Sequence, residues 1–141
     1  MPISESHVGR VYPATEPYVV SAAKVHEFAA ALQDDSPAYT GSDPIAPPTF
    51  AMVIGAAAWG ALFSDPELGL ELRRTVHGEQ RFDWDRPLRT GDAVTGTLSI
   101  TKFRARGATE MITIAVEVAT TEGERICTAT STLIHNREVA A

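Results

Sequence analysis

The 141-residue sequence predicts an α+β fold in which an antiparallel sheet wraps around one long apolar helix. Residues 50–63 contain no charged side chain, which is typical of a helix packed inside a protein core. From residue 76 onward, apolar and polar residues alternate in several segments, as in strands that bury one face of a sheet. A helix and a sheet must each cover an apolar face, so we expect them to share one core.

Length and composition favour a single domain spanning residues 1–141, since about 100–150 residues is the commonest domain size. An apolar share of 44% and a charged share of 21% are typical of a soluble globular protein. A net charge of -6 disfavours non-specific binding to nucleic acid or to an anionic membrane, because both need a positive field. The N-terminal residues do not resemble a secretory signal, and the lone Cys127 permits no intrachain disulfide, so a cytoplasmic location is expected.

The first elements are expected to be an extended arm and an amphipathic helix. Residues 10–20 are rich in β-forming side chains but contain two prolines, which favours an edge strand or an extended arm. Ser21 can cap a helix over residues 22–33, where apolar residues recur at helical spacing. Residues 34–37, Asp-Asp-Ser-Pro, should end this helix because their side chains favour turns and the residue before proline avoids the α region.

The central helix and the sheet follow. Pro48 or Thr49 can open the helix, and its uncharged surface suggests that it is enclosed on all sides. A strand is expected over residues 76–84. Three further strands are joined by short turns at Arg106-Gly107 and Glu122-Gly123, which predicts an antiparallel meander.

Three motifs, in order, resemble those of a known family. Residues 28–39, Phe-Ala-Ala-Ala-Leu-Gln-Asp-Asp-Ser-Pro-Ala-Tyr, are similar to an apolar helix end followed by Gly-Asp, any residue, Asn-Pro, an aliphatic residue and His. Residues 46–50, Ala-Pro-Pro-Thr-Phe, open the central helix. The third motif is His-Gly-Glu-Gln-Arg-Phe at 77–82 with Arg-Pro-Leu-Arg-Thr-Gly-Asp at 86–92. The sequence therefore resembles the MaoC-like hot-dog (R)-3-hydroxyacyl dehydratase/enoyl hydratase family, especially the N-terminal fatty-acid-synthase-type dehydratase domain and the acyl-binding subunit of heterodimeric hydroxyacyl-ACP dehydratases.

The resemblance implies a single hot-dog domain and places the catalytic positions of the family. Aligned to the motif, Gln33 replaces its glycine, Asp34 its aspartate, Ser36 its asparagine, Pro37 its proline and Tyr39 its catalytic histidine. The family reaction removes water from a 3-hydroxyacyl thioester and needs a base for the Cα proton. A histidine suits that task with a pKa of about 6.5, whereas a tyrosine, with a pKa of about 10, stays protonated at neutral pH. The base is therefore expected to be missing from this chain.

Other residues are candidates for binding the thioester. Backbone N–H groups at the start of the central helix could hold the thioester oxygen, and Pro48, Thr49 and Phe50 in this segment are expected to bind substrate. His77 could reach the substrate channel or could be a structural histidine. Arg86 and Arg104 lie in basic clusters that could hold coenzyme A phosphates or an acidic acyl carrier protein, or could be solvated turn residues. No histidine and carboxylate spacing resembles a metal site, and no cofactor is expected.

The leading hypothesis is an acyl-thioester-binding subunit of an (R)-3-hydroxyacyl-ACP or -CoA dehydratase. The chain would form a homodimer or a heterodimer with a catalytic hot-dog subunit. An alternative is a self-sufficient enoyl-CoA hydratase that uses Asp34 with Tyr39 or His77. A hot-dog thioesterase is a further alternative, although the central helix lacks the carboxylate that many of them use there. The last is a non-enzymatic acyl-binding homo-oligomer.

Overall fold

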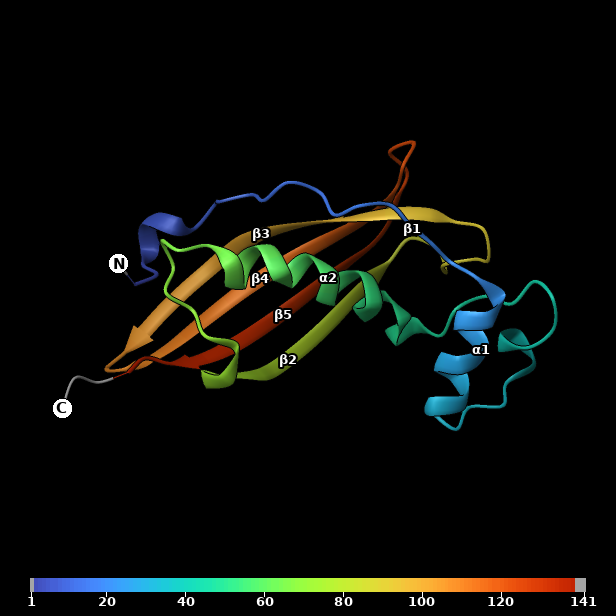
Figure 1. Cartoon of the computed structure of the whole chain (residues 1–141), viewed down its shortest axis with the longest axis horizontal. Helices are drawn as coiled ribbons and strands as arrows, with labels where there is room; N and C mark the ends of the chain where they lie inside the picture. Colours follow the sequence, from blue (N-terminus) through green and yellow to red (C-terminus); the bar gives the residue numbers. More distant parts are fainter. Residues whose placement is uncertain (1, 139–141) are drawn as a thin grey trace.

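The computed structural model describes residues 2–138 as a curled five-stranded antiparallel sheet with one long helix in its hollow (Figure 1). The strand order is β1-β3-β4-β5-β2, so the three meander strands form the middle of the sheet as expected. The fold class predicted from the alternation and from the uncharged helix is confirmed. The strands are β1 (Tyr18–Val19), β2 (Thr75–Trp84), β3 (Ala93–Arg106), β4 (Thr109–Thr120) and β5 (Arg125–Asn136).

Helix α2 (Ala51–Ser64) follows one turn of 3₁₀ helix (Pro48–Phe50) and lies across the concave face of the sheet. Its inner side chains, Ile54 among them, are buried with the apolar side chains of β3, β4 and β5 in one core cluster. Gly96 of β3 allows this close approach, because a Cβ at that position would lie 2.9 Å from Ile54 Cγ2 and 3.0 Å from Val116 Cγ1. The helix therefore rests directly on the first half of β3.

The outer face of α2 is not enclosed by this chain. Ala56, Ala57 and Gly60 are exposed, and Val53 and Trp59 are half-buried. The prediction of a helix enclosed on all sides is therefore wrong for a single chain, because one curled sheet can cover only one side of a helix. An uncharged helical surface, lined mainly by small side chains, is left facing outward.

The two edges of the sheet differ. The extended N-terminal arm runs along β3, where the N–H groups of Gly9, Tyr12 and Thr15 donate to carbonyl oxygens of β3 at 2.8, 2.9 and 3.0 Å. This arm confirms the expected edge segment and covers that side of the sheet. Strand β2 pairs with β5 alone, and no other described residues extend the ladder beyond it. The edge formed by β2 is therefore open.

Helix α1 (Ala22–Ala31) projects beyond the end of the sheet, next to the N-terminal end of α2 (Figure 1). Ser21 caps it as expected, with its Oγ accepting the Lys24 N–H at 3.1 Å. The side chain of Val25 is buried in the core, and the ring of Phe28 packs edge-on against Phe50 with centroids 5.2 Å apart. These contacts hold the α1 region beside the start of α2.

Replacing Gly96 by alanine is expected to lower the free energy of unfolding by about 1–3 kcal/mol, because the new methyl group overpacks the contact between α2 and β3. Urea unfolding followed by circular dichroism measures the change. Gly60→Ala is the matched control, since no atom lies within 4 Å of a Cβ there. That variant should be stabilised by up to about 1 kcal/mol through helix propensity. Equal stability of Gly96→Ala and the parent would contradict the close-packing account.

Candidate functional site

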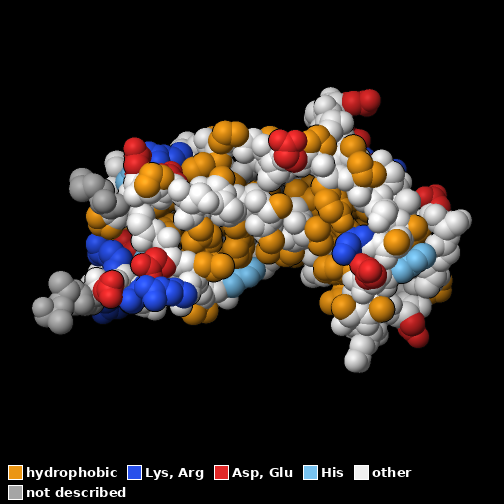
Figure 2. Space-filling model, viewed as in Figure 1, with side chains coloured by type: hydrophobic (Ala, Val, Ile, Leu, Met, Phe, Trp, Pro, Cys, Tyr) orange, Lys and Arg blue, Asp and Glu red, His pale blue; other side chains and the backbone are white. Residues whose placement is uncertain are grey.

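Two hollows meet at Tyr39, which lies at the end of a 3₁₀ turn (Pro37–Tyr39) beside the N-terminal end of α2. The larger hollow, of about 590 Å³, is open and lies on the α1 side. The smaller, of about 300 Å³, lies between this turn, the segment that leads into α2 and the end of β2. Figure 2 shows hydrophobic side chains exposed along α2 and toward α1 on this face of the molecule. Tyr39 therefore borders one hollow lined largely by polar residues and a smaller hollow lined largely by apolar residues.

The end of α1 explains one departure from the hydratase motif. Gln33 has a φ of 56°, a left-handed conformation that favours glycine. The Gln33 N–H donates to the Ala30 carbonyl and the Asp34 N–H to the Ala29 carbonyl, each at 3.0 Å. These two bonds form a Schellman motif, in which the left-handed residue ends the helix. This explains the glycine of the hydratase motif at this position, and it ends α1 at Ala31, two residues before the predicted boundary.

Asp34 serves the turn that follows. Its Oδ1 accepts the Ser36 N–H at 3.0 Å, and the Ser36 Oγ accepts the Ala38 N–H at 3.4 Å. The Asp34 side chain is exposed and also lines the larger hollow. The structure therefore brings Asp34 and Tyr39 to one hollow, and Asp34 forms the turn that was predicted for residues 34–37.

His26 is exposed and also lines the larger hollow. Its Nε2 lies 2.8 Å from the Gly41 carbonyl oxygen. A carbonyl can only accept, so Nε2 carries the hydrogen, and Nδ1 holds the lone pair when the ring is neutral. The spacing of His26, Ala29, Ala30 and Gln33 along one helix face is the signal that could have identified it.

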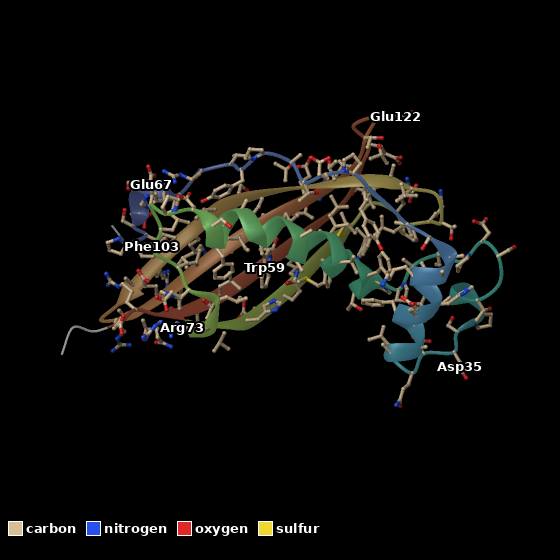
Figure 3. All side chains as sticks on the ribbon, in the orientation of Figure 1. Asp35, Trp59, Glu67, Arg73, Phe103 and Glu122 are labelled. Atoms are coloured by element: carbon tan, nitrogen blue, oxygen red, sulfur yellow. The ribbon has the colours of Figure 1, made fainter. Side chains whose placement is uncertain are left out.

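His77 lies elsewhere. Its Nε2 is 3.0 Å from Gln80 Oε1, and its ring packs edge-on against Trp59, with centroids 5.0 Å apart. Figure 3 shows Trp59 near the middle of α2, away from α1. Trp59 follows Ala51 by eight residues, which corresponds to about 12 Å along a helix. His77 lines neither hollow, so His77 and Tyr39 of one chain do not form a common site.

Arg86 is held within the protein and has no free donor for a phosphate. Its guanidinium donates to both carboxylate oxygens of Asp92, to both of Glu124 and to the Pro87 carbonyl, at 2.8–3.1 Å. These five bonds use all five N–H groups of an arginine. Burial alone would raise the pKa of Asp92, but hydrogen bonds from Arg86 and from the Arg89 N–H hold it below its usual value. Arg86 therefore fixes the turn between β2 and β3.

Arg104 lies near the far end of β3, where it lines a separate depression with Arg106 and Met111. Ten residues of strand from Val94 to Arg104 correspond to about 33 Å. Figure 1 shows that the hairpin joining β3 and β4 lies at the end of the sheet opposite α1. Arg104 and Tyr39 therefore belong to different regions of a single chain.

The start of the central helix offers fewer donors than expected. Pro48 has no N–H, and it lines the smaller hollow. The Phe50 N–H already donates to the Pro47 carbonyl at 2.9 Å, and the Phe50 ring is fully buried. Thr49 is exposed, so its N–H is the candidate donor at this end of the helix.

Residues 2–138 contain no cluster of three His, Cys, Asp or Glu side chains arranged to hold a metal ion. Within the same part of the chain, no helix is long and apolar enough to cross a bilayer.

Comparison with known proteins identifies the family. The sequence model of the FAS1-like dehydratase domain region matches residues 6–129. The chain belongs to this family. It is 53% identical to a UPF0336 protein of Cutibacterium acnes over 97% of this chain and 96% of that protein. Membership of the FAS1-like dehydratase family confirms the resemblance that the three motifs predicted.

Solved structures share the fold. One chain of the C-terminally truncated HadBC (3R-hydroxyacyl-ACP dehydratase) complex from Mycobacterium tuberculosis superposes with a TM-score of 0.79 at 22% identity, over 91% of this chain and 96% of that one. A MaoC-like dehydratase superposes with a TM-score of 0.83 at 27% identity, over 94% of this chain and 43% of that chain. Both are hot-dog proteins of the dehydratase type, which agrees with the family assignment.

Gln33→Gly, which restores the glycine of the hydratase motif, is expected to stabilise this member of the FAS1-like dehydratase region family by about 1 kcal/mol, since a left-handed residue with a Cβ costs roughly 1–2 kcal/mol. The urea midpoint should rise while the slope of unfolding free energy against urea stays constant. Gln33→Ala keeps the Cβ and should show no such gain. A gain of the same size in both variants would mean that the amide, rather than the left-handed backbone, is unfavourable.

Proposed function

We propose that the chain is the acyl-thioester-binding subunit of an (R)-3-hydroxyacyl dehydratase whose catalytic base comes from a partner subunit. The family and the fold support a hydratase-type function. The observation that supports the subunit role is Tyr39, which aligns with the catalytic histidine of the hydratase motif and lines both hollows beside the start of α2. With tyrosine in place of histidine, this chain could still bind the thioester, while the proton transfer would depend on the partner subunit.

The chemistry of the reaction explains the division of roles. Dehydration removes the Cα proton and protonates the leaving hydroxyl group, which a histidine with a pKa near neutrality can do. A tyrosine hydroxyl can donate a hydrogen bond to a thioester or to a water molecule but is a poor base at neutral pH. Asp34 already accepts the Ser36 N–H in its turn. Binding can therefore remain in a chain that does not catalyse proton abstraction.

The surface of the chain supports a hot-dog partner. Strand β2 leaves one side of the sheet open, and the neighbouring outer face of α2 is uncharged and partly exposed. A second sheet edge could add to β2 through backbone hydrogen bonds while a second helix covers α2. The related HadBC protein is by name a complex. The same arrangement in this protein would place the partner's acid and base groups against the thioester.

The purified chain is expected to show negligible hydration of crotonyl-CoA, measured by loss of the enoyl-thioester absorbance. Activity should appear when a hot-dog partner with the intact aspartate and histidine motif is added. Native mass spectrometry of the protein isolated from its host would identify that partner. In the active complex, Tyr39→Phe should leave more than about a tenth of the rate, because loss of a general base costs roughly 10²–10⁴-fold. Robust turnover by the isolated chain would overturn the proposal.

A second candidate, a self-sufficient hydratase, is favoured by one observation. His26, Asp34 and Tyr39 line the same hollow, and the bond from His26 Nε2 to the Gly41 carbonyl leaves Nδ1 available as a base. This arrangement replaces the version that relied on His77, which lies beside Trp59 instead.

The His26→Gln variant distinguishes the two candidate functions. If the isolated chain is active, His26→Gln should lower its rate by about 10²-fold or more, because the glutamine amide can still donate to Gly41 but cannot accept a proton at neutral pH. His77→Gln is the control and should leave the rate unchanged. An active chain that tolerates His26→Gln would exclude His26 as the base.

A further inference from the structure

The smaller hollow beside Tyr39 is lined by segments that are distant in sequence. The 3₁₀ turn that ends at Tyr39 forms one side, the segment leading into α2 forms another, and the end of β2 with its following turn forms the rest. The volume is about 300 Å³. Its apolar and aromatic lining consists of Tyr39, Ile45, Ala46, Pro48, Trp84 and Pro87, together with Asp85 and Arg86.

Both charged residues of this lining are neutralised by partners. Asp85 accepts two hydrogen bonds from Arg125, each at 2.9 Å. All five donors of Arg86 are used by Asp92, Glu124 and Pro87. A phosphate or carboxylate would therefore find no free cation here, whereas an uncharged apolar group loses nothing on entering. The pocket favours the hydrocarbon part of a ligand.

The walls of the pocket are held by hydrogen bonds. The Ala46 N–H donates to the Leu88 carbonyl at 2.8 Å, and the Thr90 hydroxyl donates to the Pro44 carbonyl at 2.8 Å. The Asp85 N–H donates to the Ile126 carbonyl at 2.9 Å, which ties the end of β2 to β5. The pocket is thus largely preformed, as small-molecule sites usually are.

We propose that this pocket receives the end of a short acyl chain and that Trp84 limits the chain length that fits. The proposal rests on the thioester-binding function and names its substrate class. A thioester placed at Tyr39 and the start of α2 would direct its acyl chain past Pro48 toward Trp84. The volume of about 300 Å³ is at the lower limit of roughly 300–1,000 Å³ for small-molecule sites. We therefore expect a hexanoyl chain to be accommodated better than a dodecanoyl chain.

Trp84 also provides a direct measurement of occupancy. The chain has two tryptophans, and Trp59 lies on α2 outside the pocket. In the full-length Trp59→Phe variant, the fluorescence of Trp84 should change saturably with hexanoyl-CoA and remain constant with coenzyme A alone. Calorimetry should show hexanoyl-CoA binding about tenfold or more tightly than dodecanoyl-CoA, since each methylene that is not accommodated can cost that much.

Trp84→Ala should abolish this preference by improving dodecanoyl-CoA affinity about tenfold relative to hexanoyl-CoA. Trp84→Phe should change it less, and Trp59→Ala should leave it unaltered. A folded Trp84→Ala variant with the parent's chain-length preference would overturn this inference alone, as would a fluorescence change with coenzyme A alone. A chain that binds neither acyl-CoA would overturn the thioester-binding function as well.

Discussion

The contact between α2 and β3 at Gly96 determines where the functional surfaces of this protein lie. A helix can approach a strand this closely only where the strand has no side chain, and a Cβ at Gly96 would lie 2.9 Å from Ile54 and 3.0 Å from Val116, closer than van der Waals contact allows. The helix is thereby seated in the hollow of the sheet, with its N-terminal end directed toward α1 and the end of β2. Tyr39 and both hollows are assembled around that end.

The same packing leaves two surfaces without cover in a single chain. The arm that runs along β3 satisfies one edge of the sheet, while β2 keeps an open edge beside the uncharged outer face of α2. An exposed apolar surface next to an unpaired strand is costly in water and typical of a protein interface. A partner subunit would cover both surfaces at once, which links the fold to the proposed division between binding and catalysis.

The region around Tyr39 combines a polar and an apolar space. On one side, Asp34 and His26 line an open hollow, but Asp34 also bonds the turn and His26 bonds Gly41. On the other side, the charges of Asp85 and Arg86 are directed to partners outside the pocket. The proposed thioester has a polar carbonyl and an apolar chain, which is why the proposal assigns its chain to the smaller hollow.

The sequence by itself determined the fold class, the meander, the Ser21 cap and the family, because each depends on local spacing or on motifs continuous in the chain. The motif alignment that puts Tyr39 at the position of the family's histidine is equally local, and it stays a prediction. The predicted C-terminal end of α1 was two residues too late. Glycine is the residue that usually indicates a left-handed conformation, and this chain has Gln33 at that position.

Only the tertiary structure decided which candidate residues meet. His77 and Arg104 were candidate site residues in the sequence, but neither lies near Tyr39. His77 packs against Trp59 in the middle of α2, and Arg104 lies near the far end of β3. Arg86 proved to be fully hydrogen-bonded by Asp92 and Glu124. His26 lines the hollow because residues 39–41 fold back against α1. Contacts between distant segments depend on how helices and strands pack, and the periodicity within each segment does not encode them.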